Sequence, residues 1–197
     1  KMSRSLGNTM TIDDLGKKGF TGKEIRFFLL SLHYRKSLSF SWGALETAKN
    51  TLRRLNGFIQ RLLRSSDGKG YPDADQFLYE LKKQFSDEMD DDLNISGALA
   101  ALFDFVKRVN PPLIKGLLQV GEKEHVLETM RKIDSVLGVM TFQEQNLAPE
   151  AFRLLQARDD HRKKAEWAAA DQIRKQLSEM GIAVHDTPEG MTWTLKQ

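Results

Sequence analysis

The sequence contains no cysteine, and this absence excludes several kinds of site. Without a thiol the chain can form no disulfide and no thiolate zinc site. No apolar run approaches the roughly 18 to 20 residues of a membrane span, and no apolar signal segment follows the polar first residues. The histidines lack the spacing of a ligand set: His33, His125, His161 and His185. We therefore expect a cytoplasmic protein with neither a metal site nor a membrane contact.

The distribution of charge is more informative than its total. The 197 residues are 40% hydrophobic and 29% charged, which suits one large or two small globular domains. The net charge is only +3, but residues 1–64 hold thirteen lysines and arginines against four acids, and the remainder carries −6. A basic segment of this kind suits a phosphate backbone. A solvated helix face is the other interpretation of the same pattern.

Helical periodicity dominates the first 140 residues. Apolar side chains recur at helical spacing in five stretches, which begin near Thr21, Trp42, Phe77, Ala98 and Lys123. A shorter capped helix is expected after Thr11, and Gly138 should end the last stretch. We expect Pro111 and Pro112 to end the helix that contains Ala98.

The last fifty residues have a different pattern. A helix from Ala151 onward gives way to two short strand-like stretches, 182–186 and 191–195, around a turn that contains Pro188 and Gly190. Helical spacing places Trp167 and Asp171 on one face, away from the apolar stripe of their helix. Trp193 alternates with apolar neighbours and is expected in a core. The sequence thus predicts helices followed by a small hairpin.

Four motifs follow one another along the chain and together carry a family resemblance. The first, Lys1 to Asn8, matches the K-M-S-K-S-L-G-N loop of class I aminoacyl-tRNA synthetases with Arg4 in place of a lysine. The others are R-F-F-L-L-S-L-H-Y-R at 26–35, M-D-D-D-L-N at 89–94 leading into A-L-A-A-L-F-D at 98–104, and W-A-A-A-D at 167–171 with the closing D-x-P-x-G-x-x-W at 186–193. Along its whole length the chain resembles cysteinyl-tRNA synthetases.

The resemblance implies a two-step ligation. ATP adenylates cysteine and releases pyrophosphate, and the cysteinyl group then passes to the 3′ end of the tRNA. The ATP-binding signature residues are Lys1, Met2, Ser3, Arg4 and Ser5. Arg4 would stabilise charge on the departing phosphates, although its planar fork differs from the compact ammonium of a lysine.

The family's H-I-G-H-like element and cysteine-selecting zinc site do not occur in this sequence. The resemblance therefore identifies the chain as the C-terminal part of the enzyme, without its N-terminal catalytic domain, and predicts that the part alone is inactive. ATP with magnesium, and zinc, would belong to the parent enzyme. The acids Asp90, Asp91 and Asp92 are expected to form a solvated helix cap and not a magnesium site.

The resemblance also implies the residues that contact the anticodon of tRNA(Cys): Arg162, Trp167, Asp171 and Asp186. An aromatic ring or a guanidinium plane can stack on an unpaired base, and a carboxylate can accept hydrogen bonds from its Watson–Crick edge.

We expect a mainly α protein, monomeric, with three parts. These are a signature loop and stem-contact region at 1–42, an antiparallel helical bundle at 43–145 and a small mixed α/β anticodon-binding domain at 146–197. Two other functions fit the same pattern. One is a related ligase that joins cysteine to a small amino sugar, and the other is a non-catalytic helical interaction module.

Overall fold

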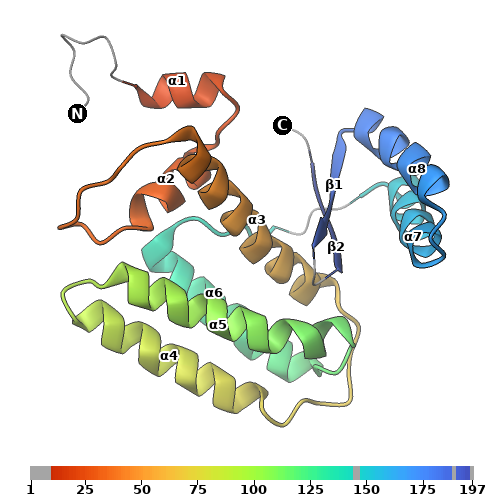
Figure 1. Ribbon diagram of the computed structural model, residues 1–197. Coiled ribbons are helices and arrows are strands. Elements are labelled where there is room, and N and C mark those ends of the chain that lie inside the picture. Colours follow the sequence, from red (N-terminus) through yellow and green to blue (C-terminus); the bar gives the residue numbers. More distant parts are fainter. Residues whose placement is uncertain (1–9, 144–146, 188–189, 196–197) are drawn as a thin grey trace. The chain divides into compact units, whose positions relative to one another are not determined.

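The computed structural model describes residues 10–143, 147–187 and 190–195, and this part of the chain is mainly helical (Figure 1). The described residues form eight helices and one antiparallel pair of strands. The elements are α1 (Ile12–Lys17), α2 (Gly22–Leu30), α3 (Trp42–Arg64), α4 (Ala74–Asp90), α5 (Ile95–Ile114), α6 (Val120–Leu137), α7 (Pro149–Lys163), α8 (Trp167–Glu179), β1 (Ile182–Thr187) and β2 (Gly190–Leu195). The predicted mainly α class with a small mixed end is confirmed.

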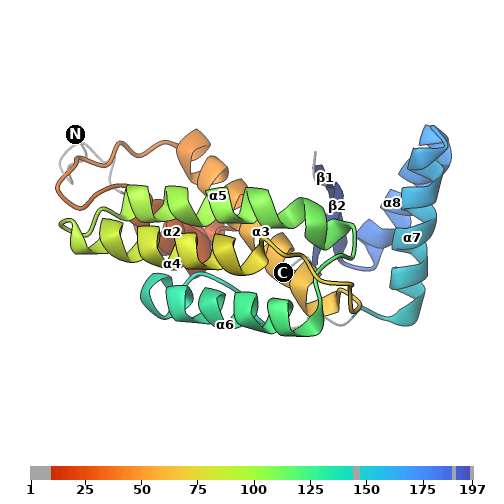
Figure 2. The same ribbon diagram turned by 90° about the horizontal axis from the view of Figure 1, so that it is seen from below.

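The chain divides into two compact units, Lys1–Phe142 and Gln143–Gln197. In the first unit α4 lies against both α5 and α6, and α3 contacts α5 and α6 (Figure 2). One continuous apolar core runs through this bundle and includes Leu55 and Phe58 of α3 and Leu102 of α5, all fully buried. The amphipathic periodicity of the sequence therefore becomes a packed helical bundle.

The helix ends follow from local hydrogen bonding. Thr11 and Asp14 form a reciprocal capping box at the start of α1, and Thr21 and Glu24 form another at α2. At the other end of the bundle Gly138 closes α6 in the left-handed region, with φ 65°. The predicted short first helix and the predicted end of α6 are confirmed.

One predicted boundary is wrong, because Pro111 and Pro112 lie inside α5 and do not stop it. A proline has a helical φ but lacks an N–H, and its ring crowds the carbonyl four residues earlier, so the cost falls on two carbonyls in the preceding turn. The last turn continues because Lys115 N donates to the Pro111 carbonyl at 3.1 Å and Leu113 is buried. The side chain of buried Asn110 also accepts a hydrogen bond from Arg61 Nε at 3.0 Å.

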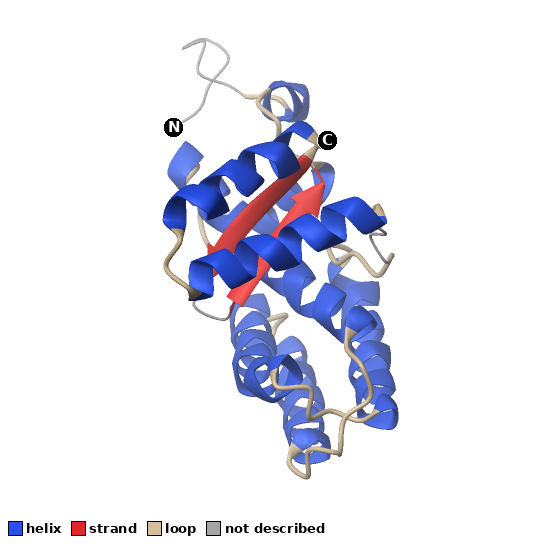
Figure 3. Cartoon of the chain, turned by 90° about the vertical axis from the view of Figure 1, so that its right-hand side faces the viewer, coloured by secondary structure: helices blue, strands red, loops and turns tan. Residues whose placement is uncertain are grey.

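The second unit is a two-stranded hairpin covered on one face by two helices (Figure 3). β1 and β2 pair antiparallel in a register that places Val184 opposite Trp193. The core of this unit consists of side chains from both helices and β1: Ala151, Leu155, Leu177, Ile182 and Val184. Trp193 packs against this core, as predicted. The predicted hairpin is confirmed, while the tip residues 188–189 lie outside the described residues.

Candidate nucleic-acid interface

A carboxylate in the second unit bridges two arginines. Nη1 and Nη2 of Arg158 donate to Oδ1 and Oδ2 of Asp186 at 2.9 and 2.7 Å. Nη1 of Arg162 lies 2.9 Å from the same Oδ2. Arg158 and Arg162 are one helical turn apart on α7 and so share a face, which meets Asp186 on β1. A paired fork of this kind fixes direction as well as distance.

Arg162 also contacts an exposed tryptophan. Its guanidinium carbon lies 5.4 Å from the centroid of the Trp167 ring, within the range of a cation–π contact. Trp167 is the first residue of α8 and is 56% exposed. An exposed aromatic next to a guanidinium is the kind of surface on which an unpaired base stacks.

The turn between α7 and α8 holds Trp167 in this place. Ala165 adopts φ 59°, Ala165 N donates to the Arg162 carbonyl at 3.0 Å and Glu166 N donates to the His161 carbonyl at 2.9 Å. This pair of bonds around a left-handed residue is a Schellman motif. The side chains of His161 and Glu166 add a contact of 2.5 Å across the turn. This short turn therefore fixes where α8 begins and where Trp167 lies.

Positive charge surrounds the carboxylate of Asp186. The hydrogen bonds from Arg158 keep the pKa of Asp186 below its ordinary value, although partial burial opposes them, and the charges of Arg158, Arg162 and Arg174 act in the same direction. Three arginines thus stabilise the ionised form of one carboxylate.

Contacts link three of the four predicted anticodon residues. The structure brings Arg162, Trp167 and Asp186 together, while Asp171 is exposed one turn along α8 from Trp167 and is not part of this set of contacts. The predicted signature residues Lys1, Met2, Ser3, Arg4 and Ser5 lie outside the described residues.

Arg158 is a member of the cluster that sequence reasoning missed. Its side chain is 1% exposed, although arginine is normally a surface residue. The available signal was its i, i+4 spacing to Arg162, which places the two guanidinium groups on one face of a helix.

Several lysines and arginines of residues 1–64 contact other groups of the first unit. Arg26 donates to backbone carbonyls at the end of α6, Lys23 donates to the Met140 carbonyl, and Arg35 pairs with Asp92 at 3.1 Å. On α3, Arg53 is partly exposed and donates to Asn50 at 2.9 Å, and Arg54 is exposed.

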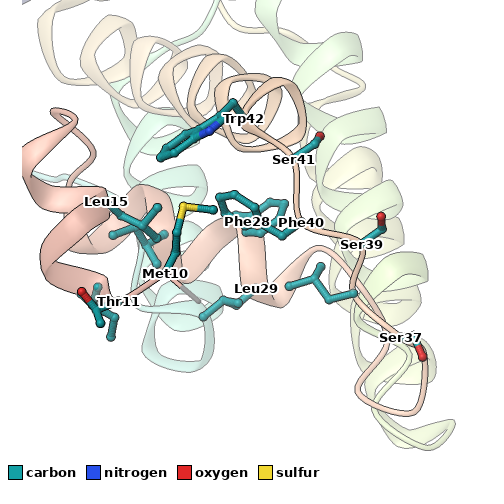
Figure 4. A pocket seen from close by; sticks show the side chains of 13 residues that line it. Met10, Thr11, Leu15, Phe28, Leu29, Ser37, Ser39, Phe40, Ser41 and Trp42 are labelled. Atoms are coloured by element: carbon teal, nitrogen blue, oxygen red, sulfur yellow. The ribbon is translucent and has the colours of Figure 1, made fainter. Parts of the chain in front are cut away.

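The first unit also has an apolar pocket of about 1040 Å³ (Figure 4). Met10 and Leu15, together with the rings of Phe28, Phe40 and Trp42, surround the space in this view. Phe40 packs edge-to-face against both other rings, with centroids 5.8 and 5.5 Å apart. The pocket is therefore lined mainly by apolar side chains, and its polar members are Thr11, Ser37, Ser39 and Ser41.

The residues that the structure describes contain neither a metal-binding cluster nor a helix that could span a membrane. No group of three or more histidine, cysteine, aspartate or glutamate side chains in the described ranges is placed to hold a metal ion. Among the helices of the described part, none has both the length and the hydrophobicity to cross a bilayer.

The sequence matches three family models and several known proteins. Residues 144–193 match the cysteinyl-tRNA ligase anticodon binding domain, residues 84–143 match the DALR domain, and residues 1–50 match the class I (C) tRNA synthetase catalytic domain. The cysteine–tRNA ligase of Protochlamydia amoebophila is 37% identical over 192 residues, which is 96% of this chain and 40% of that protein. The cysteine–tRNA ligases of Chlamydia muridarum and Chlamydia felis are 35% and 36% identical, over 97% and 96% of this chain and 42% and 40% of those proteins. The chain belongs to the cysteine–tRNA ligase family.

The family models divide the described features between them. The cysteine–tRNA ligase anticodon-binding match contains the whole Arg158–Asp186–Arg162–Trp167 cluster, and the catalytic-domain match contains the whole pocket. The family resemblance carried by the sequence motifs is confirmed. The chain spans only about 40% of the length of the cysteine–tRNA ligases that it matches.

Proposed function

We propose that this chain is the tRNA-recognising part of a cytoplasmic, ATP-dependent cysteine–tRNA ligase, and that it binds the anticodon of tRNA(Cys). The match of residues 144–193 to an anticodon-binding domain supports this function. The observation that carries the proposal is the exposed Trp167 ring with the Arg162 guanidinium 5.4 Å from its centroid. Both residues lie within the matched segment, as do Asp171 and Asp186.

Each of the four residues has a physical role in this proposal. An unpaired anticodon base stacks on the exposed part of Trp167, and Arg162 contributes charge and hydrogen-bond donors beside it. Asp171, one turn along α8, offers carboxylate oxygens to a Watson–Crick edge. Asp186 accepts bonds from two arginines and therefore acts mainly by orienting Arg162.

Trp167→Ala tests this site directly. Stacking on an aromatic contributes on the order of 1–3 kcal/mol per base, so binding of tRNA(Cys) should weaken by roughly ten-fold. Binding of the same tRNA with an altered anticodon should hardly change. Phe152→Ala is the matched control, because Phe152 is an aromatic of the same unit that is 51% exposed. Equal losses for both RNAs, or an equal effect of Phe152→Ala, would remove Trp167 from the site.

The two other functions predict different results in the same binding assay. A ligase with a small amino-sugar acceptor has no need of anticodon preference, and a helical interaction module has no need of RNA at all. Either outcome would leave the family membership intact and exclude anticodon recognition by this chain.

The ATP-dependent chemistry is assigned to the whole ligase. The described residues provide no ligand set for zinc or magnesium, and the chain has no cysteine, so no step that depends on a metal is assigned to them. In this proposal Lys1, Met2, Ser3, Arg4 and Ser5 contact the phosphates of ATP, with Arg4 providing the main charge. Zinc belongs to a part of the ligase other than this chain.

The pocket of the first unit supports a contact with the rest of the catalytic domain. Its lining comes entirely from residues 10–42, inside the catalytic-domain match, and four of its side chains are exposed apolar groups: Ile12, Leu29, Leu38 and Trp42. Clustered exposed apolar groups mark interaction surfaces. About 60% of the length of the related ligases lies outside the matched segment, so they have polypeptide available to cover such a surface.

This contact can be measured by mixing the chain with the separately produced remainder of the Protochlamydia amoebophila ligase. Leu29→Asp should weaken association by roughly ten-fold or more, because burying a leucine contributes about 1.5–3 kcal/mol. Val136→Asp is the control, since Leu29 and Val136 are 54% and 50% exposed and both lie in a last helical turn. Absence of association, equal effects of both variants, or self-association of the chain that Leu29→Asp abolishes would contradict this contact.

A further inference from the structure

Arg158 has the lowest exposure of the buried polar side chains in the described part of the chain, at 1%. Burying a guanidinium is costly, and a bidentate carboxylate repays only part of that cost. Its Nε is also buried, and no described residue accepts a hydrogen bond from it. A position that served stability alone would be better filled by an apolar side chain, so the choice of arginine needs another reason.

The exposure of the cluster's members rises from Arg158 in the core to Trp167 at the surface. The side-chain exposure is 1% for Arg158, 33% for Asp186 and 36% for Arg162. Trp167, which Arg162 contacts, is 56% exposed. Only the innermost member is closed to a ligand, so Arg158 can influence binding only through the residues that it holds.

The hydrogen bonds make this influence specific. Arg158 engages both oxygens of Asp186, which fixes the plane of the carboxylate. Arg162 then meets Oδ2 at 2.9 Å through one nitrogen, Nη1. A guanidinium has five N–H donors, so Arg162 keeps further donors for a ligand while its position is held.

We propose, on the basis of the proposed anticodon recognition, that Arg158 is a positioning residue that sets anticodon selectivity by holding Asp186, and through it Arg162, against Trp167. A lysine keeps the charge but has no planar fork and cannot engage both carboxylate oxygens in this way. The distinction between arginine and lysine at position 158 is therefore the critical comparison.

The experiment compares Arg158→Lys with Arg153→Lys, a control at an exposed position of the same helix. Affinities for tRNA(Cys) and for the same tRNA with an altered anticodon are measured at one salt concentration. Arg158→Lys should lower the ratio of the two affinities by roughly five- to ten-fold, which lies within the stacking range, with little change for the altered tRNA. Adding Arg158→Lys to Trp167→Ala should cause little further loss, because both act on one contact.

The results that overturn the proposal differ from those that overturn the proposed function. An unchanged ratio in Arg158→Lys, or fully additive losses with Trp167→Ala, would make Arg158 a structural residue only. If the unaltered chain itself shows no anticodon preference, anticodon recognition by this chain is excluded.

A second measurement without RNA tests the positioning itself. The NMR order parameter of the Arg162 Nε–H group should fall in Arg158→Lys and stay unchanged in Arg153→Lys. An unchanged order parameter in Arg158→Lys would contradict the proposal whatever the RNA results.

Discussion

Asp186 determines the charge balance of the proposed anticodon site. Among the residues that the structure describes, it is the one carboxylate that bonds both Arg158 and Arg162, and Arg174 also acts on its charge. Removing its charge would leave the buried guanidinium of Arg158 without its partner, which is more costly than losing an exposed ion pair. Folding and site geometry should therefore both depend on the ionised form of Asp186.

This dependence predicts a particular response to acid. The Arg158 hydrogen bonds lower the folded-state pKa of Asp186 below the ordinary 3.8, so the stabilisation is fully present above that value. It is lost as pH falls through the lower, folded-state pKa. Asp186→Asn should melt at a lower temperature than the unaltered chain near neutral pH, and the difference should shrink below about pH 4. Calorimetry with Asp171→Asn as the control for charge tests this; a constant difference down to pH 2 would contradict it.

At the level of single residues, the sequence predicted exposed site residues better than buried polar ones. Trp167 was expected off the apolar stripe and is exposed, because helical spacing separates the two faces. Arg158 was missed, because its spacing to Arg162 is also that of two solvated arginines on one helix face and does not show the distant carboxylate that both meet. The partner, Asp186, is 28 positions away in sequence.

The turn between α7 and α8 provides a prediction at the level of elements. Ala165 occupies the left-handed position of the Schellman motif, where a side chain costs roughly 1–2 kcal/mol. Glycine avoids that cost but loses about 0.5–1 kcal/mol of backbone entropy, so Ala165→Gly should stabilise the chain by about 0.5–1 kcal/mol. Ala168→Gly, at an exposed position inside α8, should instead destabilise it by up to about 1 kcal/mol. Chemical denaturation of both variants provides the comparison, and shifts of the same sign would contradict this account of the turn.

The outer side of α3 provides a second such prediction. If Arg53 and Arg54 contact phosphates, reversing both to glutamate should weaken binding of all RNAs alike and reduce the salt dependence of binding. Lys82 and Lys83, exposed on α4, allow the same change of charge at another surface as a control. A similar loss of RNA binding in both double variants would mean that binding depends on the net charge of the chain and not on a defined surface of α3.

Most elements were predictable from the sequence, and the exception depends on contacts within the folded unit. Caps, apolar spacing and Gly138 were sufficient for most helix ends. Pro111 and Pro112 misled because buried Leu113 and Asn110 stabilise a further helical turn, and those contacts come from distant parts of the bundle. Burial is a property of the folded unit and cannot be read from a dipeptide.

For the molecule as a whole, we predict that the chain alone does not activate cysteine. The catalytic-domain match covers only residues 1–50, and the described residues provide no metal ligands. Cysteine-dependent exchange between ATP and pyrophosphate should therefore equal that of a heat-inactivated sample. Exchange that requires cysteine and disappears in Arg4→Ala would show that this chain carries a complete active site.

The division of the molecule was only partly accessible from sequence. The chain changes pattern between 140 and 150, and the structure separates two units at 142 and 143. The proposed three-part division at 42 and 145 stays a prediction. Helical spacing could not reveal the pocket, because its lining depends on how α1, α2 and the segment before α3 fold together.

Anticodon selectivity of the unaltered chain is the most direct test of the central claim. The affinity for the anticodon stem-loop of tRNA(Cys) should be compared with affinities for three stem-loops that each carry one changed anticodon base, at two salt concentrations. Anticodon recognition predicts that at least one change weakens binding by roughly ten-fold and that the ratio survives the higher salt, since base contacts and phosphate contacts are separate. Equal affinities for all four stem-loops would contradict it.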